Sequence, residues 1–293
     1  MLFVTGPDQG KAPRLPPGRR RPGRRARRLS YFAQPQSPIW SGHATASLRD
    51  HNPVGRRPPG IRPPAPASGR VSARGYTGDR PLDLAWARQE QERLAAQVVL
   101  ADRLGRLERV AGLDVHFSRD GRQAWAAAAV LSFPGLEPLE QAVARGPVPM
   151  PYVPGFLSFR EAPAMLAALA RLSRPPGLLL CDGQGMAHPR GCGLACHLGV
   201  MSGLPCIGVA KSRLLGRHRP PSAKRGAWAP LLHQDQLIGA VLRTVDGVRP
   251  LYVSPGHLVS LPTAIALTLA CGGRFRLPEP LRAAHRLAAA AAR

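Results

Sequence analysis

The chain is poor in lysine and in acidic residues. Only Lys11, Lys211 and Lys224 are lysines, and 17 Asp and Glu stand against 41 Lys and Arg, so the formal net charge is +24 at pH 7. The near absence of lysine points to a coding bias toward arginine as much as to a binding need. A polycation of this kind favours polyanionic partners, because every phosphate that it neutralises releases condensed counterions. Nucleic acid is the first candidate partner and an anionic membrane surface is the second.

Long apolar runs are also missing. None approaches the roughly 18–20 residues that span a bilayer, and the best, 124–131 and 287–292, are short and rich in alanine. The apolar start at 1–4 is too brief for a secretory signal. These absences exclude membrane-spanning and secreted classes, so we expect a soluble, cytoplasmic, monomeric protein without a membrane partner. A hydrophobic content of 44% is enough for a sizeable core.

A paired cysteine framework is absent as well. The five cysteines are an odd number, which excludes a disulfide scaffold of the secreted type. Cys192, Cys196 and His197 form a C-x3-C-H cluster that could belong to a zinc site, but no second pair lies at finger spacing. Small apolar residues surround the cluster, and buried free thiols are the favoured interpretation.

The first 80 residues differ in composition from the rest. They contain 13 Pro, 10 Gly, sixteen basic and three acidic residues. Such a segment cannot bury enough apolar surface to offset its ordering entropy, so we expect residues 1–76 to form a disordered basic tail. The tail is either an arm that binds nucleic acid, a targeting segment or an unselected upstream extension. Residues 77–293 form the expected folded domain.

Hydrophobic patterning in this domain predicts an α/β fold. The predicted helices cover 82–104, with Asp79 as a cap, then 159–172, 192–202, 261–271 and 280–292. The predicted strands cover 109–117, 123–133, 139–145, 177–181, 206–210, 237–245 and 251–254. The turn sequence Ser118–Gly121 makes the first two strands a hairpin. An antiparallel meander followed by βαβ crossovers predicts a mixed sheet with helices on both faces.

Three acids stand out against the acid-poor background. Asp114 lies in the first predicted strand, Glu161 near the start of the second helix, and Asp182 just after the apolar strand 177–181. If the first and fourth strands are neighbours, their acids can meet at a strand end, where α/β ligand sites form. Clustered carboxylates repel one another, and a hard cation such as Mg²⁺ offsets that cost. The alternative is that each acid caps a helix or pairs with an arginine.

Two further segments have unusual local chemistry. In PYVPGFLSFRE (151–161), Pro151 and Pro154 restrict the backbone around Tyr152, which favours a stiff protrusion able to unstack a base step. A tyrosine packed beneath a loop is the alternative. In DGQG (182–185), the glycines let the backbone approach a ligand closely, and His188 and Arg190 follow at a distance suited to a phosphate.

Taken together and in this order, these segments resemble the endonuclease V (deoxyinosine 3′ endonuclease) family. The matching stretches are GLDVHF around Asp114, PYVPGFLSFRE, DGQGMAHPRGCGLACHLG, GVAKSRLLG around Lys211, SPGHLVS around His257 and RLPEPLRAAH near the end. The resemblance spans about 82–288 and leaves out the tail.

The resemblance implies a ribonuclease H-like α/β core and a deoxyribonuclease V-type hydrolase of DNA repair. Its reaction would be Mg²⁺-dependent, with Mn²⁺ expected to substitute. It would nick DNA at the second phosphodiester 3′ to deoxyinosine (hypoxanthine) and leave 3′-hydroxyl and 5′-phosphate ends. Asp114, Glu161 and Asp182 would be the catalytic, metal-binding acids, and His257 would lie beside the metal. Lys211 would position the attacking water or hold the scissile phosphate.

The resemblance also implies a substrate site. Tyr152, between Pro151 and Pro154, would be the strand-separating wedge. The everted base would enter a pocket lined by Gly155, Leu157 and Gly183, whose backbone groups read its Watson–Crick edge. His188, followed by Arg190, would support the site near the phosphate.

Three alternatives remain open. A related enzyme would cut inosine-containing RNA instead, since recognition of the 2′-hydroxyl depends on details of the pocket. A noncatalytic basic protein would coat nucleic acid through its arginines. Zinc chemistry at the C-x3-C-H cluster is the third.

Overall fold

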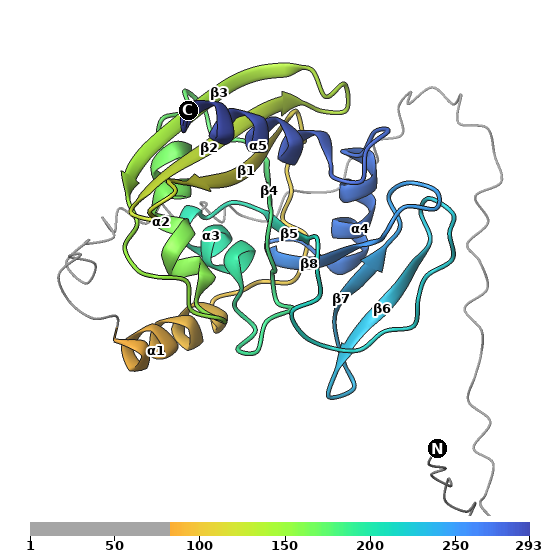
Figure 1. The fold of residues 1–293 in the computed structure, drawn as a ribbon. Helices are drawn as coiled ribbons and strands as arrows, with labels where there is room; N and C mark the ends of the chain where they lie inside the picture. Colours follow the sequence, from red (N-terminus) through yellow and green to blue (C-terminus); the bar gives the residue numbers. More distant parts are fainter. Residues whose placement is uncertain (1–82) are drawn as a thin grey trace, which may run out of the picture. The chain divides into compact units, whose positions relative to one another are not determined.

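The structure is a computed structural model that describes residues 83–293. The predicted tail 1–76, the boundary at 77 and the proposed cap Asp79 lie outside the described residues. Residues 83–293 form an eight-stranded sheet flanked by helices (Figure 1). No helix within this range is long and apolar enough to cross a bilayer.

The elements follow one another along the chain in the predicted alternation. The strands are β1 (Arg109–Phe117), β2 (Gln123–Ser132), β3 (Pro138–Pro147), β4 (Leu178–Cys181), β5 (Cys206–Ala210), β6 (Trp228–His233), β7 (Gln236–Leu242) and β8 (Leu251–His257). The helices are α1 (Leu84–Ala95), α2 (Leu157–Leu169), α3 (Leu194–Ser202), α4 (Leu261–Ala270) and α5 (Glu279–Ala291).

The sheet is mixed, as predicted. Its strand order is β3-β2-β1-β4-β5-β8-β7-β6. β1, β4 and β5 run parallel to one another, and the other neighbours are antiparallel. The predicted neighbourhood of the first and fourth strands is confirmed, and the arrangement agrees with the ribonuclease H-like core that the resemblance implies. Consequently the carboxyl ends of the parallel strands meet at one edge of the sheet.

Both faces of the sheet are covered, which explains why β4 is a continuous apolar run. Leu178 and Leu180 point into a core shared with α4 and α5, whereas Leu179 and Cys181 point into a second core shared with α2 and α3. In Figure 1, α5 lies across β1 and β2 on one side, and α2 and α3 lie on the other.

The first helix is shorter than predicted. Asp83 caps α1, accepting hydrogen bonds from the backbone N–H groups of Ala85 and Trp86 at 2.9 and 3.1 Å. The helix ends at Ala95 instead of continuing to residue 104. Beyond it, the carbonyl of Val99 accepts a hydrogen bond from Leu258 N–H, so pairing with the segment after β8 replaces helical hydrogen bonds.

Strand β6 was not predicted. Pro230 lies within it, and proline argues against a strand unless the strand is at an edge. Here β6 is the last strand of the sheet, paired on one side with β7. The two strands are joined through Gln234 and Asp235, both with positive φ (48° and 63°), as a tight hairpin turn requires.

Candidate active site

Asp114 and Asp182 lie at the same level on neighbouring strands. The parallel pair β1 and β4 aligns Leu113 with Cys181; Asp114 is the next residue on β1, and Asp182 directly follows the end of β4. Since neighbouring strands lie about 4.8 Å apart, this register brings the two carboxylates together. The prediction that the acids of the first and fourth strands meet follows from this pairing.

Glu161 reaches the same region from α2. Burial, followed by the negative charges of Asp114 and Asp182, raises the pKa of Glu161 to about 8. Burial also raises the pKa of Asp114, the charge of Asp182 adds to this effect, and the hydrogen bond from His285 opposes it. The three acids that are far apart in the chain therefore interact electrostatically in the fold.

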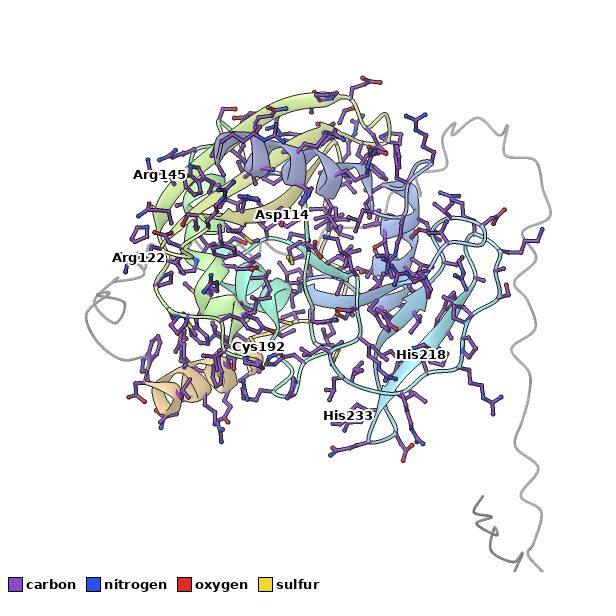
Figure 2. All side chains as sticks on the ribbon, viewed as in Figure 1. Asp114, Arg122, Arg145, Cys192, His218 and His233 are labelled. Carbon is purple, nitrogen blue, oxygen red and sulfur yellow. The ribbon has the colours of Figure 1, made fainter. Side chains whose placement is uncertain are left out.

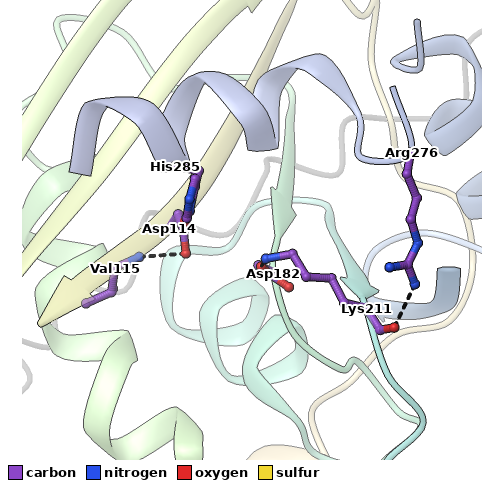
Figure 3. Close-up of polar contacts among 6 residues, drawn as sticks. All are labelled: Asp114, Val115, Asp182, Lys211, Arg276 and His285. Carbon is purple, nitrogen blue, oxygen red and sulfur yellow. Dashed lines mark hydrogen bonds and ion pairs between the residues drawn. The ribbon is translucent and has the colours of Figure 1, made fainter. Parts of the chain in front are cut away.

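Two of the acids are paired with basic side chains (Figure 3). Lys211, which directly follows β5, forms an ion pair with Asp182. His285 on α5 lies with Nδ1 2.6 Å from Oδ2 of Asp114, while Val115 N–H donates to the other carboxylate oxygen at 2.9 Å. Arg276 donates to the backbone carbonyl of Lys211 at 2.7 Å and so fixes the backbone that carries the lysine.

The donor set suits a hard divalent cation. Within residues 83–293, no three His, Cys, Asp or Glu side chains are already gathered as a metal-binding group. Nevertheless, burial and then the charges of Asp114 and Asp182 raise the pKa of Glu161, so three carboxyl groups are close enough to repel one another. Several carboxylate oxygens near an open cavity are the ligands that Mg²⁺ takes in proteins, together with water and phosphate. Binding an ion here requires Asp182 to turn from Lys211, whereas Asp114 can keep its contact with His285.

A cavity of about 310 Å³ opens beside Asp182, which is the one of the three acids in its wall. Of the residues predicted to bind substrate or act in catalysis, seven line it: Tyr152, Gly155, Leu157, Asp182, Gly183, His188 and Lys211. Its wall also includes the first two residues of α2. The residue before this helix, Phe156, makes no side-chain cap, so the backbone N–H groups at the helix start are not capped by it.

The loop that carries Tyr152 projects the tyrosine into solvent. The tyrosine side chain is 61% exposed, which rules out the alternative of a tyrosine packed under a loop. Pro151 and Pro154 flank it without lining the cavity. Gly155 adopts φ of +80°, and a Cβ there would lie 3.1 Å from the guanidinium of Arg190, so glycine is needed at this position.

His188 and Arg190 contact this loop. Both side chains bond to the carbonyl of Gly155, at 3.1 Å from His188 Nε2 and 2.6 Å from Arg190 Nη2. Burial, and then the charge of Arg190, lower the pKa of His188 to about 4, so its ring is neutral near pH 7. His188 therefore supplies no positive charge to a phosphate, and its ring contacts the loop at the Gly155 carbonyl instead.

His257 does not lie with the acids, which corrects the prediction from sequence. Strand β8 is antiparallel to β5 and continues to His257, which pairs with Cys206 at the start of β5. Lys211 lies five residues further on, about 16 Å along the strand. The His257 ring instead accepts a hydrogen bond from Val99 N–H at 3.3 Å. It is a structural histidine at the opposite end of the sheet.

Basic side chains lie on either side of the acids. Figure 2 shows Arg122 and Arg145 on the β2–β3 side, His218 and His233 on the β6–β7 side, and Asp114 between them.

Known proteins share this chain's sequence and fold. The sequence profile of the Endonuclease V family matches residues 92–286. The chain is 58% identical over 208 residues to endonuclease V of Roseiflexus castenholzii, covering 71% of this chain and 93% of the relative. The crystal structure of endonuclease V from Streptomyces avermitilis superimposes with a TM-score of 0.69 at 45% identity, covering 73% of this chain and 95% of that one. A Ciona intestinalis endonuclease V, in complex with a 24mer DNA containing an inosine followed by a ribo-adenosine, gives 0.64 at 28% identity, covering 71% and 97%.

The chain belongs to the Endonuclease V family. It is therefore a nuclease, and the hydrolase predicted from the motifs is confirmed. The match begins within α1, covers the whole sheet and ends within α5.

His285 is the site residue that sequence reasoning missed. A Cβ at Gly112 would lie 2.0 Å from the carbonyl oxygen of Pro280, so the start of α5 packs directly on β1. About one and a half turns later, the same helix brings the His285 ring into contact with the Asp114 carboxylate. The signal was present in the family stretch RLPEPLRAAH, whose last residue is His285, but no role was given to it.

The cysteines are buried free thiols, the interpretation favoured from sequence. Cys192 and Cys196 pack with Leu94 in an apolar cluster, and burial raises the pKa of Cys192 to about 12. His197 packs edge-on against Phe159 at 5.2 Å, and burial lowers its pKa to about 4. Protonated thiols in an apolar core are poor zinc ligands.

Proposed function

We propose that this endonuclease V is a DNA repair enzyme that nicks DNA at the second phosphodiester 3′ to deoxyinosine. The observation that carries the proposal is the convergence of Asp114, Glu161 and Asp182 beside a cavity that also borders the Tyr152 loop. The Ciona relative, which was crystallised with inosine-containing DNA, supports the choice of substrate. All these residues come from one chain, so we propose that it acts as a monomer.

In this proposal, the three carboxylates hold Mg²⁺, and Mn²⁺ can replace it. The bound ion would activate water and stabilise the charge that develops on the phosphodiester. Lys211 provides a cation within contact of Asp182 and can hold the scissile phosphate once that carboxylate turns to the metal. His285 orients the carboxylate of Asp114. Arg276 keeps Lys211 in place through its backbone carbonyl.

The cavity is proposed to accept the everted hypoxanthine. Its volume of about 310 Å³ is ample for a purine. Tyr152 would fill the gap that the base leaves in the stack, because its exposed ring projects from a loop braced by prolines. Backbone groups of Gly155, Leu157 and Gly183 would read the base edge, and the uncapped N–H groups at the start of α2 can donate to its carbonyl oxygen.

A cleavage assay on two duplexes tests the proposal. One duplex contains a single deoxyinosine and the other has deoxyadenosine at the same position, and each is incubated with Mg²⁺ or with a chelator. We expect one break, at the second bond 3′ to inosine, only with Mg²⁺ and only in the first duplex. Equal cutting of both duplexes would refute inosine recognition, and cutting under chelation would refute the metal site.

An endoribonuclease that acts on inosine in RNA is the second candidate. The ligand of the Ciona relative carries a ribo-adenosine after the inosine, which favours a site that admits a ribose there. Three single strands that differ only in sugar distinguish the candidates: all deoxyribose, one ribo-adenosine after inosine, and all ribose. A preference of more than about tenfold in kcat/KM for the all-ribose strand would assign the RNA function.

A further inference from the structure

The carbonyl oxygen of Gly155 is held by three side chains. Arg190 Nη2 lies 2.6 Å from it, Gln91 Nε2 3.0 Å and His188 Nε2 3.1 Å. The backbone N–H of Arg190 donates to His188 Nδ1 at 3.3 Å, which leaves the ring hydrogen on Nε2 to be donated to Gly155. Three donors on one peptide oxygen restrain the position of that peptide.

Gln91 connects the other members of this group. Its Oε1 accepts from Arg190 Nε at 2.6 Å, and its Nε2 also donates to the carbonyl of Cys192 at 3.3 Å. The side chain is only 1% exposed, although most of α1 faces solvent. A buried amide is costly unless its hydrogen bonds are made, and these contacts satisfy both ends of the amide.

The guanidinium of Arg190 is directed into the loop. It bonds to the uncharged acceptors of Gly155 and Gln91, and it stacks on the ring of Phe156 at 4.4 Å from the ring centre. Phe156 N–H in turn donates to the carbonyl of Val153 at 3.0 Å, closing the turn that presents Tyr152. The hydrogen bonds and the stacking therefore act on one short segment, 153–156.

We propose that Gln91 is a positioning residue for substrate recognition: together with Arg190 and His188 it clamps the Gly155 peptide, which preorganises both the Tyr152 protrusion and the wall of the base cavity. Gln91 itself does not line the cavity. It acts through Gly155, which does. The consequence for catalysis rests on the proposed function, whereas the clamp on the loop does not.

Three variants of the full chain test this role. Gln91→Ala removes every contact of the amide. Gln91→Glu keeps the shape and the acceptor for Arg190 but removes the donor to the carbonyls of Gly155 and Cys192. Gln89→Ala, an exposed glutamine two residues earlier on the same helix, is the matched control. Thermal unfolding of each variant verifies that it is folded at the assay temperature.

Hydrogen exchange measures the clamp without any substrate. In both Gln91 variants we expect peptides that cover 152–157 to exchange about tenfold faster than in the control, because their local opening becomes easier. Unchanged exchange in this segment would overturn the clamp. Faster exchange spread over the whole chain would mean general destabilisation and would overturn it as well.

Steady-state kinetics on inosine-containing duplex and single strand measure the consequence. Both Gln91 variants should raise KM about tenfold on both substrates and leave kcat within about twofold, since the reacting groups are untouched. A fall in kcat at unchanged KM would contradict a positioning role in recognition. If wild-type protein cuts no inosine substrate while exchange still responds to Gln91, the proposed function fails and the clamp stands.

Discussion

The loop that carries Tyr152 and the site of the three acids differ in how their polar groups are paired. Around Gly155, donors from Gln91, Arg190 and His188 converge on one carbonyl. Around Asp114 and Asp182, the carboxylates repel one another and Glu161, and Lys211, the partner of Asp182, can be exchanged for an ion.

This difference indicates whether each region needs a bound ligand or ion to complete it. The Gly155 carbonyl receives its three donors without a ligand, so the loop is preorganised to act as a wedge. The acid site has a surplus of negative charge in a strongly basic protein, so it is completed by a cation. Changes at the acid site should therefore abolish chemistry, and changes at the loop should weaken recognition.

The largest effect is expected from Asp182→Asn. The substitution keeps the shape but removes one charged ligand and the partner of Lys211, so single-turnover nicking should fall by about a thousandfold or more. Binding of inosine-containing duplex, measured by fluorescence anisotropy, should change little. The control is Asp235→Asn in the exposed β6–β7 turn. Turnover that stays within tenfold of wild type would remove Asp182 from the site.

His285→Ala should have the next largest effect. Its ring orients the carboxylate of Asp114, and loss of a partner that orients a metal ligand typically costs about 10- to 100-fold in activity or metal affinity. We expect a higher Mg²⁺ concentration for half-maximal nicking. The control is His233→Ala, at the end of the edge strand β6 (Figure 2). An unchanged Mg²⁺ requirement would show that the contact has no part in metal binding.

The raised pKa of Glu161 makes metal binding dependent on pH. Below about 8 its carboxyl is protonated in the metal-free protein, and a cation must displace that proton. Apparent Mg²⁺ affinity should therefore rise with pH, by up to about tenfold per unit below the pKa, and level off above it. Titrations from pH 6 to 9 test the slope. Glu161→Gln should remove this dependence, and a slope that survives in that variant would assign it to another group.

The smallest effect is expected at the tip of the loop. Tyr152→Ala should raise KM for an inosine-containing duplex about fivefold, because stacking on the exposed ring is lost. The same oligonucleotide as a single strand should be affected little, since no stack has to be opened. Tyr152→Phe keeps the ring and should behave like wild type. Equal losses on duplex and single strand would exclude a wedge.

Sequence patterns were most informative where the contacts are local or set by strand register. The alternation and length of the apolar segments predicted strands β1, β4 and β5 and therefore the meeting of Asp114 with Asp182. The two prolines around Tyr152 predicted a stiff protrusion, because proline restricts its own backbone whatever lies nearby.

Patterns failed where distant segments decide the outcome. His285 meets Asp114 only because α5 docks on β1 at Gly112, a contact between segments about 170 residues apart that no local pattern encodes. His257 was expected beside the metal, but β8 runs antiparallel to β5, so His257 lies next to the start of β5, at the end of the strands away from the acids. Strand β6 was not predicted because a proline is tolerated only in an edge strand, and the fold alone shows which strands lie at an edge.

Direct measurement of metal binding tests the central claim, that Asp114, Glu161 and Asp182 share a divalent cation. Full-length protein and the Asp182→Asn variant are titrated with Mn²⁺ at pH 8.5 by isothermal titration calorimetry, with Asp235→Asn alongside. We predict saturable binding in wild type and in Asp235→Asn, weakened at least about 100-fold in Asp182→Asn. Identical isotherms for wild type and Asp182→Asn would contradict the account.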